Sequence, residues 1–131
     1  MRITIISETK IQNKYVKEAI KEYTKRLGAF AKVNYLITTN PEKDISKNAY
    51  VIQIDANGES ISSEELAQKI DNLAVHGHSH IVFLLGTSSS ISLDFSLAIS
   101  QMDMDSDILS IVLYEQIYRA FTIIANRPYH K

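Results

Sequence analysis

The chain has 131 residues, 45% of them hydrophobic, and it contains no cysteine. This length and composition suit one domain over residues 1–131 with a single core. They exclude disulfides and thiolate metal sites, which fits a cytoplasmic location. No apolar run approaches the ~20 residues that a membrane-spanning helix needs, so we expect a soluble domain without membrane contact.

The net charge of −1 conceals an uneven distribution of charge. Residues 1–47 hold ten of the fourteen lysines and arginines against five acidic residues, whereas residues 48–131 hold four against ten. A basic part of a fold can mark a surface that binds nucleic acid. An ordinary lysine-rich helix facing solvent explains the same charges, and both interpretations stay open.

The first part of the chain predicts two strands with a helix between them. Arg2–Ser7 alternates as a strand does, and a helix with one apolar face follows from about Asn13 to Gly28. Lys32–Thr38 predicts a second strand, and residues 39–49 a polar connection. Residues three and four apart share one side of a helix, so four lysines form one stripe: Lys14, Lys17, Lys21 and Lys25.

The middle of the chain continues this alternation. Tyr50–Asp55 predicts a strand that ends in a turn at Asn57 and Gly58. A capping box that begins at Ser62 opens the next helix. Ile81–Leu85 is a continuous apolar run, typical of a central parallel strand covered on both faces.

The last part of the chain predicts one more strand and a long helix. The strand covers Leu97–Met104, and the helix covers about Ile108–Ala125 behind acidic capping residues. Strands that alternate with helices around an apolar central strand predict an α/β fold. We expect a mainly parallel sheet with helices on both faces.

In sheets of this kind, ligands bind beyond the carboxyl ends of the strands. Gly86–Ser90 and Met102–Ser106 meet this description, and their backbone amides can bind the polar edge of a nucleotide-like ligand. The sequence contains no phosphate-loop or dinucleotide motif, so a plain surface turn explains Gly86–Ser90 equally well.

Three alternating histidines, His76, His78 and His80, suggest a metal site at first sight. No Asp, Glu or Cys lies nearby to complete the ligand set, and the segment connects a helix to a strand. We therefore expect a solvated connection and no metal.

The last helix is apolar on more than one face, which requires burial on two sides. One side can pack on the sheet, and the other can meet a partner subunit or the rest of the same domain. Glu115 and Arg119 are four residues apart and can pair across one turn. That pair is either a modest intrahelical salt bridge or a device that positions an arginine for an anionic substrate.

The residues behind this helix carry polar, aromatic and titratable groups where a chain normally frays. Asn126 suits the position just past a helix end, and Pro128 prevents continuation. Tyr129 can stack on a base, and His130 can act as an acid, a base or a hydrogen-bond donor. An ordered tail in a site and a disordered tail both stay open.

Three separated stretches resemble one known family, in the same order along nearly the whole chain. They are Arg2–Ile5 with Ala19–Gly28, then Ser62–Gln68, and then Glu115–Phe121 with Asn126–Lys131. The last stretch is similar to the carboxyl-terminal signature of the RlmH-type SPOUT methyltransferases.

The resemblance implies a homodimer of α/β subunits with a C-terminal trefoil knot, a rare exception to unknotted topology. It also implies transfer of a methyl group from S-adenosylmethionine to N3 of a pseudouridine in large-subunit (23S) ribosomal RNA, with the ribosome as partner. The cofactor is expected in the knot, near the dimer interface.

By position, the resemblance assigns roles to individual residues. Ile54 ends a cofactor-lining strand, and Gly86 approaches the cofactor through its backbone. Arg119, Tyr129 and His130 match residues associated with activity, and the lysine stripe is our own expectation for an RNA-facing surface. The adenosine-binding segment is Ile99, Ser100, Gln101, Met102, Asp103 and Met104.

The sequence departs from the family pattern around the expected cofactor site. Thr87 and Ser90 stand where the family has glycines, which restricts the backbone there. Asp105 and Ser106 replace a Pro-His pair, and Ser110 replaces an arginine. These changes make the area less attractive to RNA phosphates.

The chain also lacks a helical segment near residues 41–47 and a turn or two near residues 92–96. Three hypotheses follow: an active methyltransferase, a degenerate relative that binds RNA or a ribosome as a knotted dimer, and a small-molecule-binding α/β domain.

Overall fold

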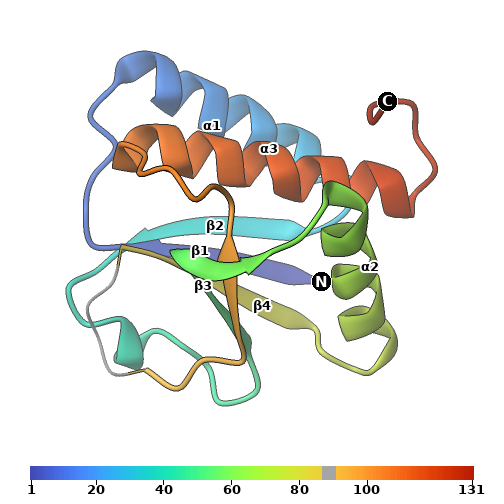
Figure 1. The fold of residues 1–131 in the computed structure, drawn as a ribbon, viewed down its shortest axis with the longest axis horizontal. Coiled ribbons are helices and arrows are strands. Elements are labelled where there is room, and N and C mark those ends of the chain that lie inside the picture. The colour runs from blue at the N-terminus through green and yellow to red at the C-terminus, as the bar shows by residue number, and fades with distance from the viewer. Residues whose placement is uncertain (87–90) are drawn as a thin grey trace.

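The structure, a computed structural model, describes residues 1–86 and 91–131 (Figure 1). In chain order, the elements of these residues are β1 (Arg2–Ser7), α1 (Lys14–Leu27), β2 (Lys32–Ile37), the 3-10 helix η1 (Pro41–Lys43), β3 (Tyr50–Ser60), α2 (Ser63–Val75), β4 (His80–Leu85), β5 (Phe95–Ala98) and α3 (Ser106–Ile124). None of these helices combines the length and the hydrophobicity that crossing a bilayer requires. The predicted α/β class is confirmed.

The strands form one parallel sheet in the order β2-β1-β4-β3-β5. β4 lies in the middle, and all of its residues are buried, as its apolar sequence predicts. Ile54 of β3 pairs with Leu85 of β4. Gly86, the next residue along, therefore lies at the same edge of the sheet as Ile54.

Side-chain caps fix where the helices begin, as the sequence predicts. Asn13 accepts hydrogen bonds from the first amides of α1. Ser62 and Glu65 form the expected capping box of α2, with bonds of 3.0 and 2.9 Å. Asp105 caps α3 through the amide of Asp107. Each cap satisfies amides that lack a partner within the helix.

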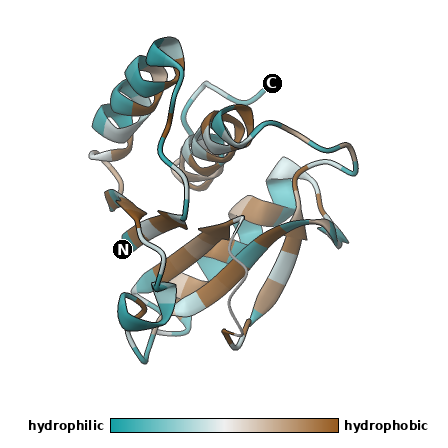
Figure 2. Ribbon diagram, turned by 90° about the vertical axis from the view of Figure 1, so that its left-hand side faces the viewer, coloured by the Kyte–Doolittle hydropathy of each residue, from teal (hydrophilic) through white to brown (hydrophobic). Residues whose placement is uncertain are grey.

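The two faces of the sheet are covered differently. All three α-helices pack against one face, in a cluster that contains Ile5, Phe83 and Ile117. We expected helices on both faces, but no α-helix of the described residues lies on the second face. There, a smaller cluster is covered by the connection that follows η1, through Ile45 and Ala49, and by Ile91. The apolar strands lie beneath the hydrophilic α1 (Figure 2).

Two expected strands have different bounds in the structure. β3 continues through the predicted turn to Ser60, with an irregular register between Ile54 and Glu59. A Cβ on Gly58 would lie 2.8 Å from backbone atoms of Ser96, so the glycine lets β3 approach β5 closely. β5 ends at Ala98. The alternating residues that follow β5 form a loop, because β3 ends at the same level and no strand remains to pair with them.

Candidate active site

The last residues of the sequence fold back against α3 rather than extending from it (Figure 1). Asn126 has a φ of 58°, the left-handed conformation that commonly ends a helix. The Arg127 amide donates to the carbonyl of Thr122 at 2.9 Å, which closes the helix end. Pro128 then prevents a return to helix. The expected stop after α3 is confirmed, and it turns the tail toward the side of the helix.

Glu115 is the central acceptor of the tail. The guanidinium of Arg119 binds it through two nitrogens, at 2.8 and 3.2 Å. The hydroxyl of Tyr129 donates to the same carboxylate at 2.7 Å. Charge-assisted bidentate bonds of this kind are the strong ones in proteins. The predicted pair between Glu115 and Arg119 is therefore confirmed, and it also holds the tail.

The ionisation of these groups follows from their contacts. Burial acts to raise the pKa of Glu115, but hydrogen bonds from Arg119 and Tyr129 outweigh it and lower that pKa. The hydrogen bond to Glu115 raises the pKa of Arg119. Burial and hydrogen bonds to Tyr23 and Glu115 raise the pKa of Tyr129. At neutral pH the cluster thus contains a carboxylate, a guanidinium and a neutral phenol.

Both ring nitrogens of His130 are engaged. Arg119 Nη1 donates to Nδ1 at 2.9 Å, and Nε2 lies 2.5 Å from Oε1 of Glu64. A guanidinium cannot accept a hydrogen bond, so Nδ1 must be unprotonated and the proton must lie on Nε2. Glu64 must move before Nε2 can donate its proton to a substrate, and Arg119 must move before Nδ1 can accept one.

Aromatic contacts complete the attachment of the tail. The hydroxyls of Tyr23 and Tyr129 lie 3.3 Å apart. The Tyr129 ring meets Tyr118 edge to face at 4.8 Å, and the Arg119 guanidinium lies 5.0 Å from its centre. Tyr23 belongs to α1, Tyr118 to α3 and Glu64 to α2. The tail is ordered and joins all three α-helices.

The residues expected to bind the cofactor lie largely around one cavity. Its volume is about 120 Å³. It is lined by Ile54, Asp55, Ala56, Ile99, Ser100, Met102, Asp103, Met104 and Leu109. Gln101 is exposed and does not line this cavity. The structure thus brings together the end of β3 and the loop before α3, as the resemblance implies.

The residues that line this cavity suit an adenosyl group. Ile54, Ile99 and Leu109 offer apolar walls for a base, and the carboxylates of Asp55 and Asp103 can accept hydrogen bonds from ribose hydroxyls. Gly86 has a φ of 58°, and a Cβ there would meet nothing within 4 Å. The backbone beside the sheet edge is therefore open to a ligand. Thr87 and Ser90 lie outside the described residues.

A second cavity of about 260 Å³ adjoins the first, because Ile99 and Met104 line both. Together, the two fall within the ~300–1,000 Å³ of typical ligand sites. Gln116 forms part of the wall of the second cavity and bonds to Ser63 at 2.6 Å. Its amide also donates to Glu115 at 2.9 Å. A chain of polar contacts thus connects this cavity to the tail.

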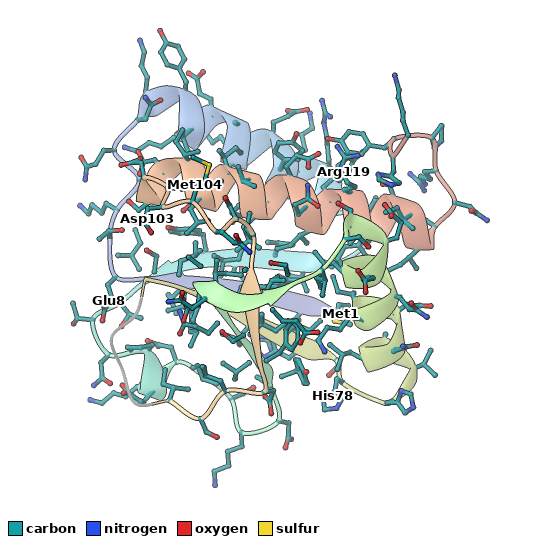
Figure 3. The ribbon with its side chains drawn as sticks, viewed as in Figure 1. Met1, Glu8, His78, Asp103, Met104 and Arg119 are labelled. Atoms are coloured by element: carbon teal, nitrogen blue, oxygen red, sulfur yellow. The ribbon has the colours of Figure 1, made fainter. Side chains whose placement is uncertain are left out.

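The tail cluster and the first cavity lie at different places along α3. Leu109 lines the cavity and Arg119 belongs to the cluster, which corresponds to ~15 Å along a helix that rises 1.5 Å per residue. Figure 3 shows Asp103 and Met104 near one end of α3, with Arg119 farther along it. Within one chain, the expected catalytic and cofactor-binding residues are not in direct contact.

The lysine stripe lies on the exposed surface of α1. Lys14, Lys17, Lys21 and Lys25 are all exposed, and none forms an ion pair with another described residue. The Lys14 ammonium lies 5.0 Å from the ring of Tyr15. The stripe therefore keeps its positive charges available to an external anion.

Asp107, next to the substituted pair, and the substituted Ser110 have structural partners. The buried carboxylate of Asp107 accepts hydrogen bonds from the amides of Gln12 and Asn13, at 2.9 and 2.7 Å. Ser110 is 1% exposed and donates to the carbonyl of Ser106. An arginine at position 110 would not fit this packing, and Asp107 is engaged with the start of α1 rather than with a ligand.

The three alternating histidines have separate surroundings. His80 is buried between the hydroxyls of Thr4 and Ser46, at 2.8 and 3.1 Å. His78 meets the ring of Tyr50, and His76 lies 2.7 Å from a carbonyl of its own helix. They do not face a common point.

The family model described as "Predicted SPOUT methyltransferase" matches residues 1–130. The chain therefore belongs to the SPOUT methyltransferase family, whose fold carries the knot that the resemblance implies.

Within that family, the chain is 39% identical to the ribosomal RNA large subunit methyltransferase H of Clostridium botulinum (strain Alaska E43 / Type E3). It is 38% identical to the protein of the same name from Alkaliphilus oremlandii (strain OhILAs). Both alignments include the whole of both chains. They run over 159 residues whereas this chain has 131, so 28 aligned positions have no counterpart here.

Sequence reasoning missed several residues of the site. Tyr23 and Glu64 contact the tail from α1 and α2, and Gln116 links it to the second cavity. From the sequence alone, Tyr23 is an ordinary residue on the apolar face of α1, and Glu64 is an acidic residue in the first turn of α2. Only the packing of the three helices reveals their role.

Proposed function

We propose that this protein transfers a methyl group from S-adenosylmethionine to N3 of a pseudouridine in large-subunit ribosomal RNA. The observation that carries the proposal is a match to ribosomal RNA methyltransferases over the whole chain, together with an intact cluster around Glu115 that fixes Arg119, Tyr129 and His130.

S-adenosylmethionine supplies an electrophilic methyl group on a sulfonium. Ile54, Ile99 and Leu109 would hold its adenosyl part, with Asp55 and Asp103 near the ribose. Such transfer depends mainly on alignment of the acceptor with the methyl group, so the chain contributes chiefly by binding and orienting both molecules.

The acceptor nitrogen must also lose a proton. His130 can receive it only at its unprotonated Nδ1, and therefore only after Arg119 moves away from that nitrogen. Release of Glu64, whose side chain is 61% exposed, would free Nε2, which already carries the proton and can only donate it. Arriving RNA phosphates would attract the Arg119 guanidinium and favour its release from Nδ1.

We propose that the protein acts as a homodimer. α3 is largely buried within its own chain, but Ile108 remains 48% exposed, next to Met102 at 78% and Met104 at 36%. Since Met102 and Met104 line the first cavity and Ile108 follows them at the start of α3, we infer that the three form an apolar patch beside it. A partner subunit on this patch would shield the cofactor from solvent. Its tail would then lie beside the cofactor cavity of the first subunit. This arrangement accounts for the ~15 Å between the tail cluster and the cavity within one chain.

The assay is methyl transfer to large ribosomal subunits and to 70S ribosomes that lack the modification. The radioactive methyl group of S-adenosylmethionine should appear in one nucleotide of the large-subunit RNA, and mass spectrometry should identify N3-methylpseudouridine. Calorimetry measures cofactor binding separately, and sedimentation measures the dimer. Absence of cofactor binding at millimolar concentration would exclude the enzyme hypothesis, and a monomeric mass at micromolar concentration would exclude the dimer.

A degenerate relative is the second candidate. It is favoured by the 28 missing positions and by the substitutions at Asp105, Ser106 and Ser110. Such a protein would bind ribosomes in a salt-dependent way without methylating them. Ribosome binding without methyl incorporation under the same conditions distinguishes it from the enzyme.

A further inference from the structure

A groove of about 480 Å³ lies between α1 and β2, at the edge of the sheet. It is distinct from the cavities beside α3 and from the tail cluster. Its lining is largely apolar, and it also includes charged and polar residues: Lys17, Glu18, Lys21, Asn34, Tyr35 and Tyr114 are among its residues.

Tyr35 presents an unused hydrogen-bonding group in this groove. Its ring stacks on Tyr114, with 6.4 Å between the ring centres. Its hydroxyl oxygen is buried, and it has no hydrogen-bond partner among the described residues. Such a group costs free energy unless a ligand or a water molecule supplies a partner. The hydroxyl therefore lacks a partner that a ligand reaching it from the groove would supply.

The charge of the groove favours an anion. Lys17 and Lys21 are exposed on the same side of α1, and Glu18 is the only carboxylate among the lining residues. The basic stripe extends past the groove at both ends, from Lys14 to Lys25, over ~16 Å of helix. An array of this length suits several phosphates in a row better than one small anion.

We propose that this groove binds the sugar–phosphate backbone of an RNA strand, with Lys17 and Lys21 on phosphates and the Tyr35 hydroxyl donating to a phosphate or ribose oxygen. Because that hydroxyl is buried in the free protein, entry of the strand has to open the groove far enough to reach it. This inference rests on the proposed function, since the RNA is the substrate of the same enzyme. In this proposal, α1 and β2 bind a part of the RNA substrate that lies outside the methylation site.

The test measures binding of the full chain to purified ribosomes over a series of salt concentrations. Lys17→Gln and Lys21→Gln should each reduce the slope of log affinity against log salt by about 1. Tyr35→Phe should weaken binding by about two- to tenfold, the usual effect of one hydrogen bond. The matched controls are Lys47→Gln and Tyr50→Phe, which lie outside the groove and should bind like the unchanged protein.

Thermal unfolding of the free protein gives a second measurement. Tyr35→Phe removes an unpartnered buried hydroxyl, so Tm should stay the same or rise. A fall in Tm would show that the hydroxyl serves the fold and would overturn its assignment to RNA. Unchanged ribosome binding in all three variants would overturn the proposal that the groove binds RNA.

The groove and the proposed activity can fail separately. Loss of affinity in the three variants without methyl transfer by the unchanged protein supports the groove and refutes the activity. Methyl transfer by the unchanged protein, with no effect of the three substitutions on ribosome binding, supports the activity and refutes the groove. Absence of ribosome binding by the unchanged protein would overturn both.

Discussion

Glu115→Gln is the sharpest test of the tail cluster. The substitution preserves the size of the side chain and one acceptor oxygen but removes the negative charge. It leaves the Arg119 guanidinium without a carboxylate and the Tyr129 hydroxyl with a weaker acceptor. We expect a less stable protein whose last residues are loosely held.

The magnitude follows from the exposure of the pair. Breaking a fully buried ion pair costs about 3–5 kcal/mol, whereas exposed pairs contribute about 0–1 kcal/mol. The side chains of Arg119 and Glu115 are 25% and 21% exposed, so an intermediate loss of about 2 kcal/mol is expected. With an unfolding entropy of ~2.1 cal/mol/K per residue, a chain of this length should lose about 7 °C in Tm.

A matched control lies on α1. Glu22 and Arg26 form a pair with the same four-residue spacing, but their side chains are 52% and 48% exposed. Glu22→Gln should therefore leave Tm unchanged within error. Calorimetry of both variants gives the comparison, and hydrogen exchange should show faster exchange at the Tyr129 amide in Glu115→Gln alone.

Equal shifts of Tm in the two variants would refute this reasoning, because they would assign the effect to helix charge rather than to the tail. A double-mutant cycle of Glu115→Gln with Tyr129→Phe adds a second criterion. The two changes remove partners of one hydrogen bond, so their effects should not add. Additive effects would contradict a shared contact.

Further predictions concern pH, packing and the departures from the family. The lowered pKa of Glu115 means that its carboxylate stabilises the fold above its ordinary value of 4.5. The Tm difference between the parent and Glu115→Gln should therefore be full at neutral pH and disappear as the pH falls through the lowered pKa. Gly58→Ala should destabilise by about 1–3 kcal/mol, measured in urea, because the added Cβ meets the backbone of Ser96 at 2.8 Å. Ser110→Arg, which introduces the residue that the resemblance implies at this position, should lower Tm, since this position is 1% exposed.

Local sequence signals predicted most of the fold because they act over a few residues. Asn13, Ser62 and Asp105 each carry an oxygen that caps the helix behind it, and this chemistry is readable without the rest of the structure. The apolar run of β4 is equally local. These elements and their parallel arrangement were predicted correctly.

The errors concern features that depend on distant partners. Residues 99–104 alternate like a strand but lie where β3 has ended, so they cannot pair. The face of the sheet that carries no α-helix likewise depends on packing that the alternation of elements does not specify. Tyr23, Glu64 and Gln116 join the site through contacts across the fold, and their sequence neighbours give no sign of it.

The attachment of the tail to three helices also has a kinetic consequence. The hydroxyl contact between Tyr23 and Tyr129 joins residues 106 positions apart, so it closes one of the longest loops in the chain. We expect such a contact to form after the folding transition state. Substitutions there should then accelerate unfolding while leaving the folding rate nearly unchanged. The same few residues that arrange the proposed catalytic groups would thus govern how long each molecule remains native.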